Sequence, residues 1–463
     1  MTASPTGSSR TPTSRFLAVA WRALGGGEAW LERVDFVGDG DLPSAFAVSD
    51  LAVASVAAAA LAVAERAASA TSRPPHVVVD RRLASLWFGF SLKPMGWTLP
   101  PVWDPIAGDY PAADGWIRLH TNATRHREAA LAALGCGGGR DTVAAAVRGA
   151  RADELEAAIV ARGGCAAVMR SLAAWADHPQ GRAVAAEPLV LLDKREATGA
   201  ADRPIDPVRP LAGVRVLDLT RILAGPVATR FLAAYGADVL RLDPPGWDEP
   251  SVAPEATLGK RCARLDLKDA GGRARFFALL AEADVIVHGY RPGALDALGL
   301  GEAERRRARP GLVDVSLDAY GWSGPWAGRR GFDSLVQMSA GVAAEGMRRF
   351  GKDKPTPLPV QALDHAAGYL LAAAAVRALT ERAVSGAGSS HRLSLARVAA
   401  LLASERADAQ APFVPVGEAD YASEIEATDW GPARRLRPPA VVEGALMLWA
   451  RPASRLGAAQ PAW

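Results

Sequence analysis

The sequence predicts an α/β fold in which a doubly wound parallel sheet is accompanied by a smaller α+β domain. Three observations support this fold class. From Leu211 onward, short apolar runs typical of buried strands alternate with helical stretches, which is the pattern of a parallel sheet covered by helices. A polar segment at residues 193–210 separates this half from a mainly helical first half. The length of 463 residues is enough for two or three domains.

Composition indicates a globular protein of the cytoplasm. The chain is 49% hydrophobic, and its 53 Lys and Arg residues are balanced by 50 Asp and Glu residues, so nothing indicates nucleic-acid binding. The cysteines, Cys136, Cys165 and Cys262, lie far apart, which indicates a reducing compartment and no metal site. The longest apolar run, residues 51–64, is shorter than the roughly 20 residues that a membrane span needs. We therefore expect no membrane segment.

The first half is predicted to be mainly helical. Residues 1–27 begin as a polar stretch without the apolar segment of a signal peptide, so we expect a disordered leader. Residues 28–192 contain a long Ala-rich helix, a short strand HVVVD, and a hairpin signal at Asp114 and Gly115 before the strand WIRLH. Residues 193–210, DKREATGAADRPIDPVRP, are polar and are interpreted as a linker.

The second half, residues 211–404, is predicted to hold the parallel sheet, and the Pro-rich tail at 405–463 is expected to pack on the core. Four apolar runs predict strands: VRVLDLT, ADVLRLD, DVIVHGY and LVDVSL. In such a sheet the ligand binds at the carboxyl ends of the strands. A dinucleotide is not favoured as this ligand, because the turn TRILAGP after the first strand lacks the GxGxxG fingerprint.

An internal repeat is suggested by residues 42–89 and 358–404. Both segments begin with LP, continue as an Ala-rich helix with an ER pair in register, and lead into a strand that starts with histidine. A shared Ala-rich composition is the alternative explanation. If the repeat is real, Val48 takes the place of Asp364 in the first copy, and only the second copy keeps the carboxylate.

Asp364 is the candidate catalytic residue. It opens the Ala-rich run within residues 359–382, where we expect it to be a helix N-cap held by free backbone N–H groups and by the positive end of the helix dipole. On these grounds alone a structural cap is the plain interpretation. The motifs upstream of it favour a functional role.

These upstream motifs resemble the family III CoA-transferases, the CaiB and BaiF group. The resemblance is carried, in order and spacing, by LAGVRVLDLTRILAGPVATRFLAAYGADVLRLD, by GKRCARLDLKDAGGRARFFALLAEADVIVHGYRPGALDALGL and by PGLVDVSLDAYGWSGPWAGRRGFDSLVQMSAG. It implies a CoA-binding domain over residues 211–404. Residues 42–192 resemble the second half of a family member, with a small domain, so the chain resembles a fused and rearranged member of the family.

The resemblance implies a CoA-transferase that moves CoA between an acyl-CoA and a carboxylic acid. It makes Asp364 the nucleophile, kept ionised by its helix-start position and forming an aspartyl-CoA thioester, and it implies no bound cofactor because CoA is a substrate. Lys260 and Arg261 are expected to contact phosphates, although a solvated turn is the plain alternative, and His288 is otherwise a strand-end histidine. The residues implied to contact CoA are Leu223, Ala224, Gly225, Gly259, Lys260, Arg261, His288, Tyr290 and Arg291.

Departures from the family pattern leave alternatives open. Pro244 and Pro245, Ala297 and Asp318 stand where basic residues are often found, which suggests weaker CoA binding and a catalytically degenerate binding or assembly partner as an alternative. Phe332 replaces the His of the racemase motif GHD, which disfavours a racemase. An acyl-CoA isomerase would use the same nucleophile. With its halves permuted, the chain either closes on itself or forms a homodimer.

Overall fold

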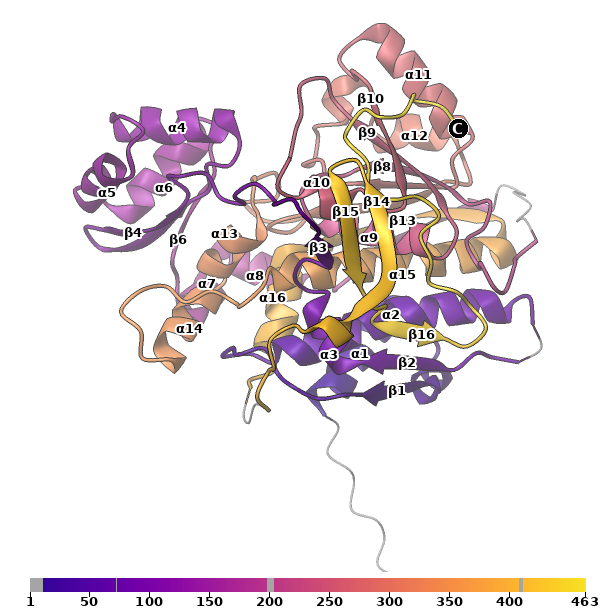
Figure 1. Ribbon diagram of the computed structural model, residues 1–463. Helices are drawn as coiled ribbons and strands as arrows, with labels where there is room; N and C mark the ends of the chain where they lie inside the picture. Colours follow the sequence, from indigo (N-terminus) through magenta and orange to yellow (C-terminus); the bar gives the residue numbers. More distant parts are fainter. Residues whose placement is uncertain (1–10, 72, 198–203, 408–410) are drawn as a thin grey trace, which may run out of the picture.

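The computed structural model describes residues 11–71, 73–197, 204–407 and 411–463. These residues form a mixed α/β structure built on a seven-stranded sheet (Figure 1). Neighbouring strands are parallel except for the last pair, which is antiparallel. The predicted fold class is therefore confirmed. In spatial order the strands are β10 (Lys260–Arg264), β9 (Asp238–Asp243), β8 (Arg215–Leu219), β11 (Val285–His288), β12 (Val313–Asp318), β13 (Ala387–Ser394) and β7 (Leu191–Ala197).

The order of the strands reverses between β8 and β11. From β8 the chain moves outward through β9 and β10, and it then returns to the other side of β8, where Val285 of β11 pairs with Val216. The connections that follow β8 and β11 therefore leave the sheet in opposite directions. Such a reversal opens a crevice at the carboxyl ends of the two strands, which is where open α/β sheets bind their ligands.

Helices that follow the strands cover the sheet, and local capping explains where several of them begin. The Asp269 side chain accepts a hydrogen bond from the Gly272 N–H at the start of α11, and Ser394 accepts one from Arg397 at the start of α16. The helices of this half are α9 (Ala224–Ala234), α10 (Ala253–Ala256), α11 (Ala270–Ala281), α12 (Glu302–Ala308), α13 (Asp333–Ser339), α14 (Val342–Arg349), α15 (Ala362–Ser385) and α16 (Leu395–Ala403), with the short 3₁₀ helix η2 (Asp296–Leu298).

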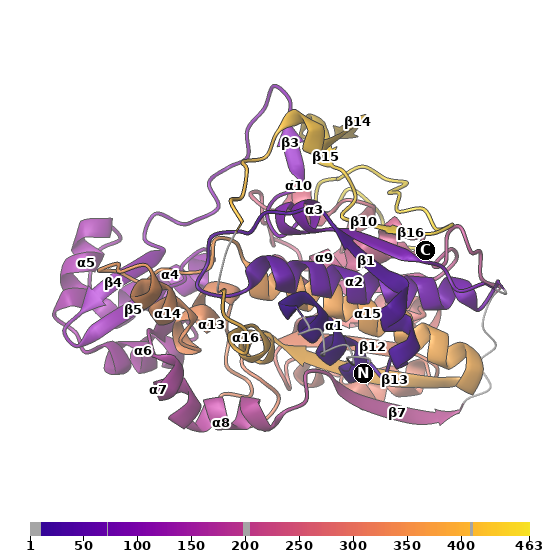
Figure 2. The ribbon, with the colours of Figure 1, turned by 90° about the horizontal axis from the view of Figure 1, so that it is seen from below.

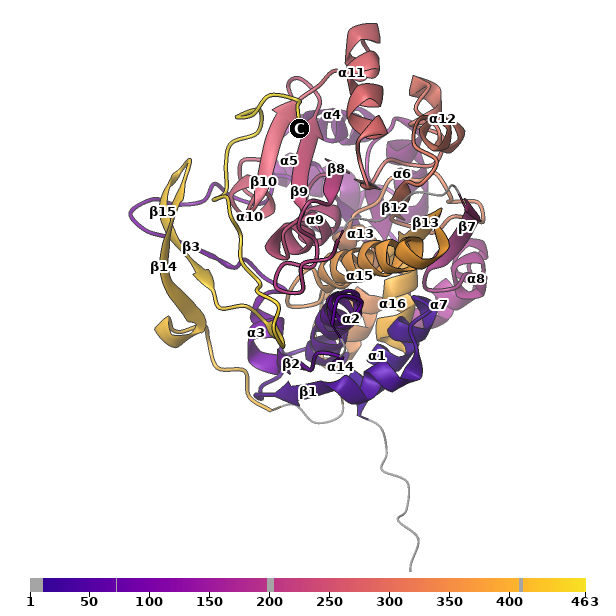
Figure 3. The same cartoon turned by 90° about the vertical axis from the view of Figure 1, so that its right-hand side faces the viewer.

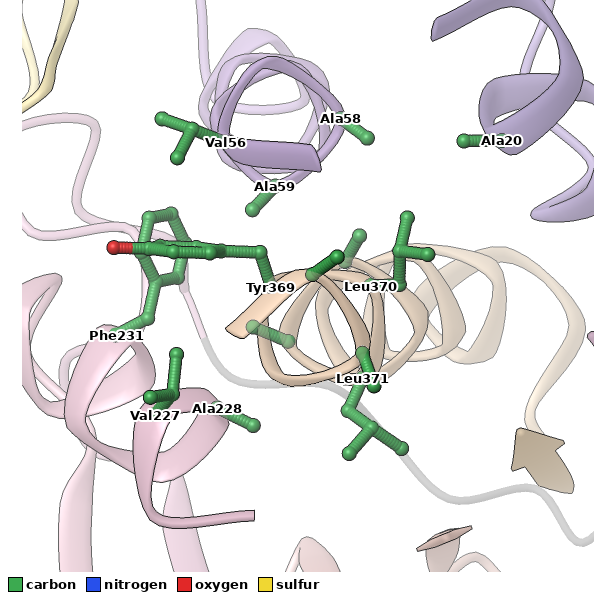
Figure 4. Close-up of a cluster of buried hydrophobic side chains, with 14 of the residues drawn as sticks. Ala20, Val56, Ala58, Ala59, Val227, Ala228, Phe231, Tyr369, Leu370 and Leu371 are labelled. Carbon is green, nitrogen blue, oxygen red and sulfur yellow. The ribbon is translucent and has the colours of Figure 1, made fainter. Parts of the chain in front are cut away.

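The centre of the molecule is a layer of helices in which α15 packs between α9 and α2 (Val48–Ala68) (Figure 3). The Ala-rich sequences of α2 and α15 let these two helices approach closely. Figure 4 shows Tyr369 of α15 between α2 and Phe231 of α9, and the two rings meet edge to face with centroids 5.8 Å apart. Gly368 is required at this contact, because a Cβ there would lie 2.5 Å from the carbonyl oxygen of Ala224.

Helix α2 is the one helix in the described part of the chain that is long and apolar enough to cross a membrane by length and composition. It has 21 residues, so it is longer than the apolar run 51–64 seen in the sequence, and length alone does not exclude a membrane span. In the protein, 89% of its apolar window is buried. Here α2 is a core helix, with α15 as a packing partner.

Two segments expected to be irregular are ordered. The predicted leader extended to residue 27, but residues 12–23 form α1 (Pro12–Ala23), in which Phe16 and Trp21 are each only 1% exposed; residues 1–10 lie outside the described residues. Likewise, residues 193–197 of the predicted linker belong to β7, the antiparallel edge of the main sheet, and residues 198–203 are outside the description. Helix α1 adds apolar packing surface and β7 adds backbone pairing at the edge of the sheet, and composition alone revealed neither.

A small α+β lobe, residues 108–168, lies to one side of the main sheet (Figure 2). It contains the antiparallel strands β4 (Gly108–Ala112), β5 (Gly115–Leu119) and β6 (Ala166–Val168), packed against α4 (Thr124–Leu134), α5 (Arg140–Arg148) and α6 (Ala152–Ala161). The predicted hairpin at Asp114 and Gly115 joins β4 to β5. The small lobe has an apolar core of its own, which includes Ile117, Val143 and Ile159.

The remaining elements connect the two halves with the tail. In the first half they are η1 (Glu28–Arg33), β1 (Val34–Val37), β2 (Val77–Asp80), α3 (Arg81–Leu86), β3 (Leu92–Pro94), α7 (Leu172–Asp177) and α8 (Pro179–Ala186). The tail contributes η3 (Glu418–Asp420), β14 (Tyr421–Thr428), β15 (Gly431–Leu436) and β16 (Ala440–Val442). Strand β15 pairs with β3, and β16 pairs with β2.

A buried ionic cluster joins these three parts of the chain. Glu255 of α10 pairs with Arg230 of α9 and, at 2.9 Å, with Arg435 of the tail, and it accepts a hydrogen bond from Ser91 of the first half at 2.7 Å. Each of these side chains is almost fully buried. Removing one partner would leave a buried charge uncompensated, so the cluster fixes the tail and the first half against the main sheet.

Candidate active site

A cavity of about 420 Å³ opens at the carboxyl ends of β8 and β11, at the point where the strand order reverses. One wall is the loop at residues 219–225 after β8, and another is the segment 289–291 after β11. The small lobe contributes Arg125 and His126. Five of the residues predicted to contact CoA line this cavity: Leu223, Ala224, Gly225, Tyr290 and Arg291.

Asp364 also lines this cavity, from the first turn of α15. It is 7% exposed. The helix begins at Ala362 with Gln361 as its N-cap, so the prediction that Asp364 itself is the cap is wrong. A different residue caps the helix, and the side chain of Asp364 remains available to the cavity.

Gln361 occupies the N-cap position but makes no capping bond with its side chain. The capping bonds are made by the carboxylate of Asp333, at the start of α13. Its Oδ2 accepts hydrogen bonds from the backbone N–H groups of Leu363 at 2.9 Å and of Asp364 at 3.0 Å, while its Oδ1 accepts one from Gln337 Nε2 at 2.5 Å. Asp333 is fully buried. This carboxylate belongs to the GRRGFD motif, and sequence reasoning did not assign it a role.

The pKa values of both carboxyls are raised. Burial is the largest cause for both, and the charge of Asp333 raises the pKa of Asp364 further, well above its usual range. Three N–H donors stabilise the ionised form of Asp333 and oppose the effect of burial there, so Asp364 is the more readily protonated of the two. The expectation that helix position keeps Asp364 ionised is therefore wrong: its surroundings favour the neutral acid.

The start of α9 forms the wall next to Asp364. Gly368 lies one turn after Asp364 on the same face of α15, and its position against Ala224 brings the two helices together. By their place in the first turn, the N–H groups of Ala224 and Gly225 have no partner within α9. Ile222, just before this helix, has φ of 67°, a left-handed conformation that is costly for a β-branched residue.

Arg221 is held between two aromatic rings at the edge of the cavity. Its guanidinium lies 5.1 Å from the ring centroid of Trp247 and 5.2 Å from that of Tyr290, and it donates a hydrogen bond of 2.9 Å to the Tyr290 hydroxyl. Cation–π contacts of this kind fix the position of a charged side chain. The cavity therefore has a rigid positive and aromatic rim.

Three more arginines make the cavity electropositive. In the described part of the chain, Arg125, Arg291 and Arg330 pair with no carboxylate. Burial is the largest cause that lowers the pKa of Arg125, and the charge of Arg330 lowers it further. Burial likewise lowers the pKa of Arg330, and the charge of Arg291 lowers it further. An anion bound between them would relieve this repulsion.

Sequence reasoning missed part of this charge. The cavity is lined by Ala297 and Asp318, where the sequence suggested a deficit of basic residues, but Arg125 and Arg330 compensate. The available signal was the run TRHR at residues 124–127 and the pair of arginines before Gly331. Asp318 itself is half-buried, and desolvation raises its pKa to about 7, so at neutral pH it adds only part of a negative charge.

The segment 259–261 lies outside this cavity, and the prediction of phosphate contacts there is corrected. Lys260 begins β10 at its amino end and is 1% exposed; its ammonium donates to Asp218 Oδ2 at 3.0 Å and to the Pro226 carbonyl at 3.1 Å. Arg261 pairs with Asp238 at 2.6 Å. Gly259 lies against the ring of Trp449 from the tail, which leaves no room for a Cβ.

His288 is likewise engaged elsewhere. It ends β11 and is 7% exposed, and its Nε2 lies 3.3 Å from Asp314 Oδ1, next to Arg305. Burial opposes ionisation of Asp314, but His288 and Arg305 lower its pKa overall. His288 is therefore part of a buried ionic group beneath the cavity, in line with the strand-end alternative.

Comparison with known proteins finds one matching family model and relatives that align with only part of this chain. Residues 211–427 match the model of CoA-transferase family III. A probable fatty acyl-CoA transferase of Mycobacterium tuberculosis is 35% identical over 195 residues, which is 39% of this chain and 49% of the relative. An acyl-CoA transferase of Gibberella moniliformis is 31% identical over 310 residues, 61% of this chain and 53% of the relative. The mouse succinyl-CoA:glutarate CoA-transferase is 33% identical over 206 residues, 41% and 46% of the two chains.

The chain thus spans about half the length of the curated relatives it matches. Among solved structures, the crystal structure of the M. tuberculosis protein covers 42% of this chain and 57% of its own, with 31% identity and a TM-score of 0.38. A CaiB/BaiF family protein from Brucella suis covers 48% and 65%, with 25% identity and a TM-score of 0.38.

Proposed function

Residues 211–427 of this chain belong to CoA-transferase family III, and from this premise we propose that the protein moves CoA between an acyl-CoA and a carboxylic acid. The observation that carries the proposal is the position of Asp364: a carboxyl group in the wall of an electropositive cavity at the switch point of the sheet. The relatives act, by their names, on fatty acyl, acyl and succinyl or glutarate groups. Those names differ, so the acyl group here is argued separately below.

In the proposed reaction, Asp364 first loses its proton to solvent. Its carboxylate oxygen attacks the thioester carbonyl, and the C–S bond breaks to give a mixed anhydride and the CoA thiolate. The thiolate attacks the aspartyl carbonyl, a C–O bond breaks, and the first acid leaves as its carboxylate. The second carboxylate then attacks the aspartyl-CoA thioester, and the same steps in reverse give the new acyl-CoA and free Asp364.

The surroundings of Asp364 suit these steps. The free N–H groups at the start of α9 are donors for the oxyanions that develop at the carbonyl, and a charge there is also favoured by the helix dipole. Arg125, Arg291 and Arg330 provide the positive charge for the phosphates of CoA, and Arg221 with its aromatic neighbours is a surface for the adenine ring. The raised pKa of Asp364 limits attack on wrong electrophiles, because only the ionised form is a nucleophile.

The free cysteines, Cys136, Cys165 and Cys262, fit a reducing compartment, and we place the activity in the cytoplasm. In the proposed reaction CoA is part of the substrate and not a bound cofactor: the acyl-CoA is the donor and the second carboxylic acid is the acceptor.

Intact-mass measurement tests the proposal. Wild-type protein and Asp364→Asn are incubated with short acyl-CoAs, and the mass of the chain is recorded after gel filtration. We expect a CoA-sized increase on the wild type that is absent from Asp364→Asn and is removed by hydroxylamine. CoA binding without any adduct, at any pH up to 9, would instead favour the catalytically degenerate binding partner.

A further inference from the structure

A second cavity, of about 620 Å³, lies on the far side of the wall that carries Asp364. Leu223 lines both cavities, Phe332 and Asp364 line the first, and their sequence neighbours Asp333 and His365 line the second. The two cavities are therefore separated by little more than the side chains around Asp364. A CoA thioester held at Asp364 would have one space for CoA and another for the acid that leaves or enters.

We propose that this second cavity binds the organic part of the substrate, and that the substrate is a monocarboxylic acid with an apolar, aromatic or branched body. This inference rests on the proposed transferase function and names its substrate class. It is carried by the chemistry of the lining.

The walls of the second cavity are mainly apolar and come from three parts of the chain. Phe90 comes from the first half, Val102 and Trp103 from the segment leading into the small lobe, and Leu358 and Val360 from the segment before α15. Phe90 and Trp103 are 37% and 39% exposed, so both leave apolar surface open to the cavity. An apolar ligand would cover them, and the volume is in the range of small-molecule sites.

The charges of this cavity disfavour a second carboxylate on the substrate. Arg118 is the one arginine or lysine among the described lining residues. It already pairs with Asp109 at 2.7 Å and lies 5.0 Å from the ring centroid of Trp103. Asp333 adds a buried carboxyl to the same wall. A dicarboxylate would place its far end here without a free cation, and an uncompensated buried charge is costly.

Two polar atoms in the lining lack a partner and mark the end of the cavity at which a carboxyl group belongs. Ser334 Oγ and His365 Nδ1 are buried and form no hydrogen bond within the protein. Both residues adjoin the carboxyl pair, Ser334 following Asp333 and His365 following Asp364. Burial lowers the pKa of His365 to about 3, so its ring is neutral. Buried polar atoms usually have a hydrogen-bond partner, and in this proposal the carboxyl group of the incoming acid supplies it.

Competing acids test the inference. The wild-type protein is first converted to the Asp364–CoA adduct, and the rate at which an acid discharges it is followed by intact mass. We expect phenylacetate or isovalerate to discharge the adduct at least tenfold faster than glutarate at equal concentration and ionic strength. Discharge by glutarate at an equal or higher rate would overturn the inference while leaving the transferase proposal intact.

A second test compares a tryptophan substituted inside the second cavity with one substituted outside it. Val102→Trp and Val360→Trp place a large ring in the cavity. Val441→Trp places the same ring on β16, where Val441 is 63% exposed and lines neither cavity. We expect the first two variants to slow discharge by phenylacetate at least tenfold and Val441→Trp to match the wild type. Equal rates in all three would overturn the inference.

Binding without CoA separates this inference from the proposed function. If no adduct forms with any donor, the transferase proposal fails, but saturation-transfer NMR with phenylacetate still reports on the cavity. A signal that weakens in Val360→Trp and not in Val441→Trp would support the apolar site on its own. A signal unchanged in Val360→Trp, or absent from the wild type, would overturn it.

Discussion

The carboxylate of Asp333 accepts a hydrogen bond of 3.0 Å from the backbone N–H of Asp364, so one acidic residue holds the helix that presents the other. This arrangement uses the capping bond to fix the direction of the candidate nucleophile. It also brings a negative charge close to it, which raises the pKa of Asp364 beyond the effect of burial. Positioning and protonation of Asp364 therefore depend on the same neighbour.

Asp364→Asn is expected to stabilise the fold increasingly as the pH rises. The folded pKa of Asp364 lies above its unfolded value, so folding favours the protonated form, and stability is lost as the pH rises from the unfolded pKa through the folded one. The variant removes that loss. Between pH 5 and 7 the difference in free energy of unfolding should grow by up to about 1.4 kcal/mol per pH unit. Urea titrations of both proteins at each pH measure it; a constant difference would contradict the shifted pKa.

Asp333→Asn is expected to move the pH dependence of adduct formation downward. The substitution removes the charge that raises the pKa of Asp364, so the nucleophile ionises at lower pH. The amide keeps one acceptor oxygen for the N–H groups of α15, and the helix should still begin at Ala362. The rate of the CoA-sized mass increase, recorded from pH 5 to 9, gives the midpoint. An unchanged midpoint would show that burial alone sets the pKa of Asp364.

Arg330→Gln is expected to weaken CoA binding by about tenfold or more, because a charge-assisted hydrogen bond contributes about 1.5–3 kcal/mol. The loss should be larger at low salt, where phosphate contacts are least screened. Isothermal titration with CoA at two salt concentrations measures both effects. The control is Arg349→Gln on the exposed end of α14, which removes the same charge away from the cavity; an equal loss in both variants would point to net charge alone.

Lys260→Met is expected to destabilise the fold without changing CoA affinity. The substitution leaves Asp218 buried and unpaired, at a cost of about 3–5 kcal/mol, because the Lys260 ammonium donates to it at 3.0 Å in a fully buried position. The urea midpoint should fall, and the CoA titration of the remaining folded protein should match the wild type. A selective loss of CoA affinity at unchanged stability would restore the phosphate contact expected from the sequence.

Much of the sheet could be predicted because its strands are local signals. Runs such as VRVLDLT and DVIVHGY are apolar over the length of a buried strand, and they became β8 and β11. The segment 193–197 was not predicted as a strand, because its side chains are mostly polar and exposed at the edge of the sheet. Likewise, Phe16 and Trp21 are buried by packing of α1 against α2, a contact that composition does not encode.

The candidate site shows the same division. Asp364 was found because it opens an Ala-rich run downstream of the family-like motifs, and the loop before α9 was found because it follows a predicted strand. The pairing of Asp333 with Asp364 was missed because it joins residues that are 31 positions apart and lie on different helices. Arg125 was missed because it comes from the small lobe. The prediction that Lys260 contacts phosphate was wrong because a motif gives the residue type only. It does not tell whether the side chain points to the ligand or into the core, as it does here.

The packing of α2 against α15 has a further consequence for how the protein behaves on dilution. Both helices belong to one chain, so their association is intramolecular, and its effective concentration is set by the covalent connection rather than by the amount of protein. The core around Tyr369 can form in a single chain (Figure 4). If the site needs no second copy, activity per mole should stay constant from micromolar to nanomolar protein, whereas an obligate homodimer would lose activity in proportion to its dissociation.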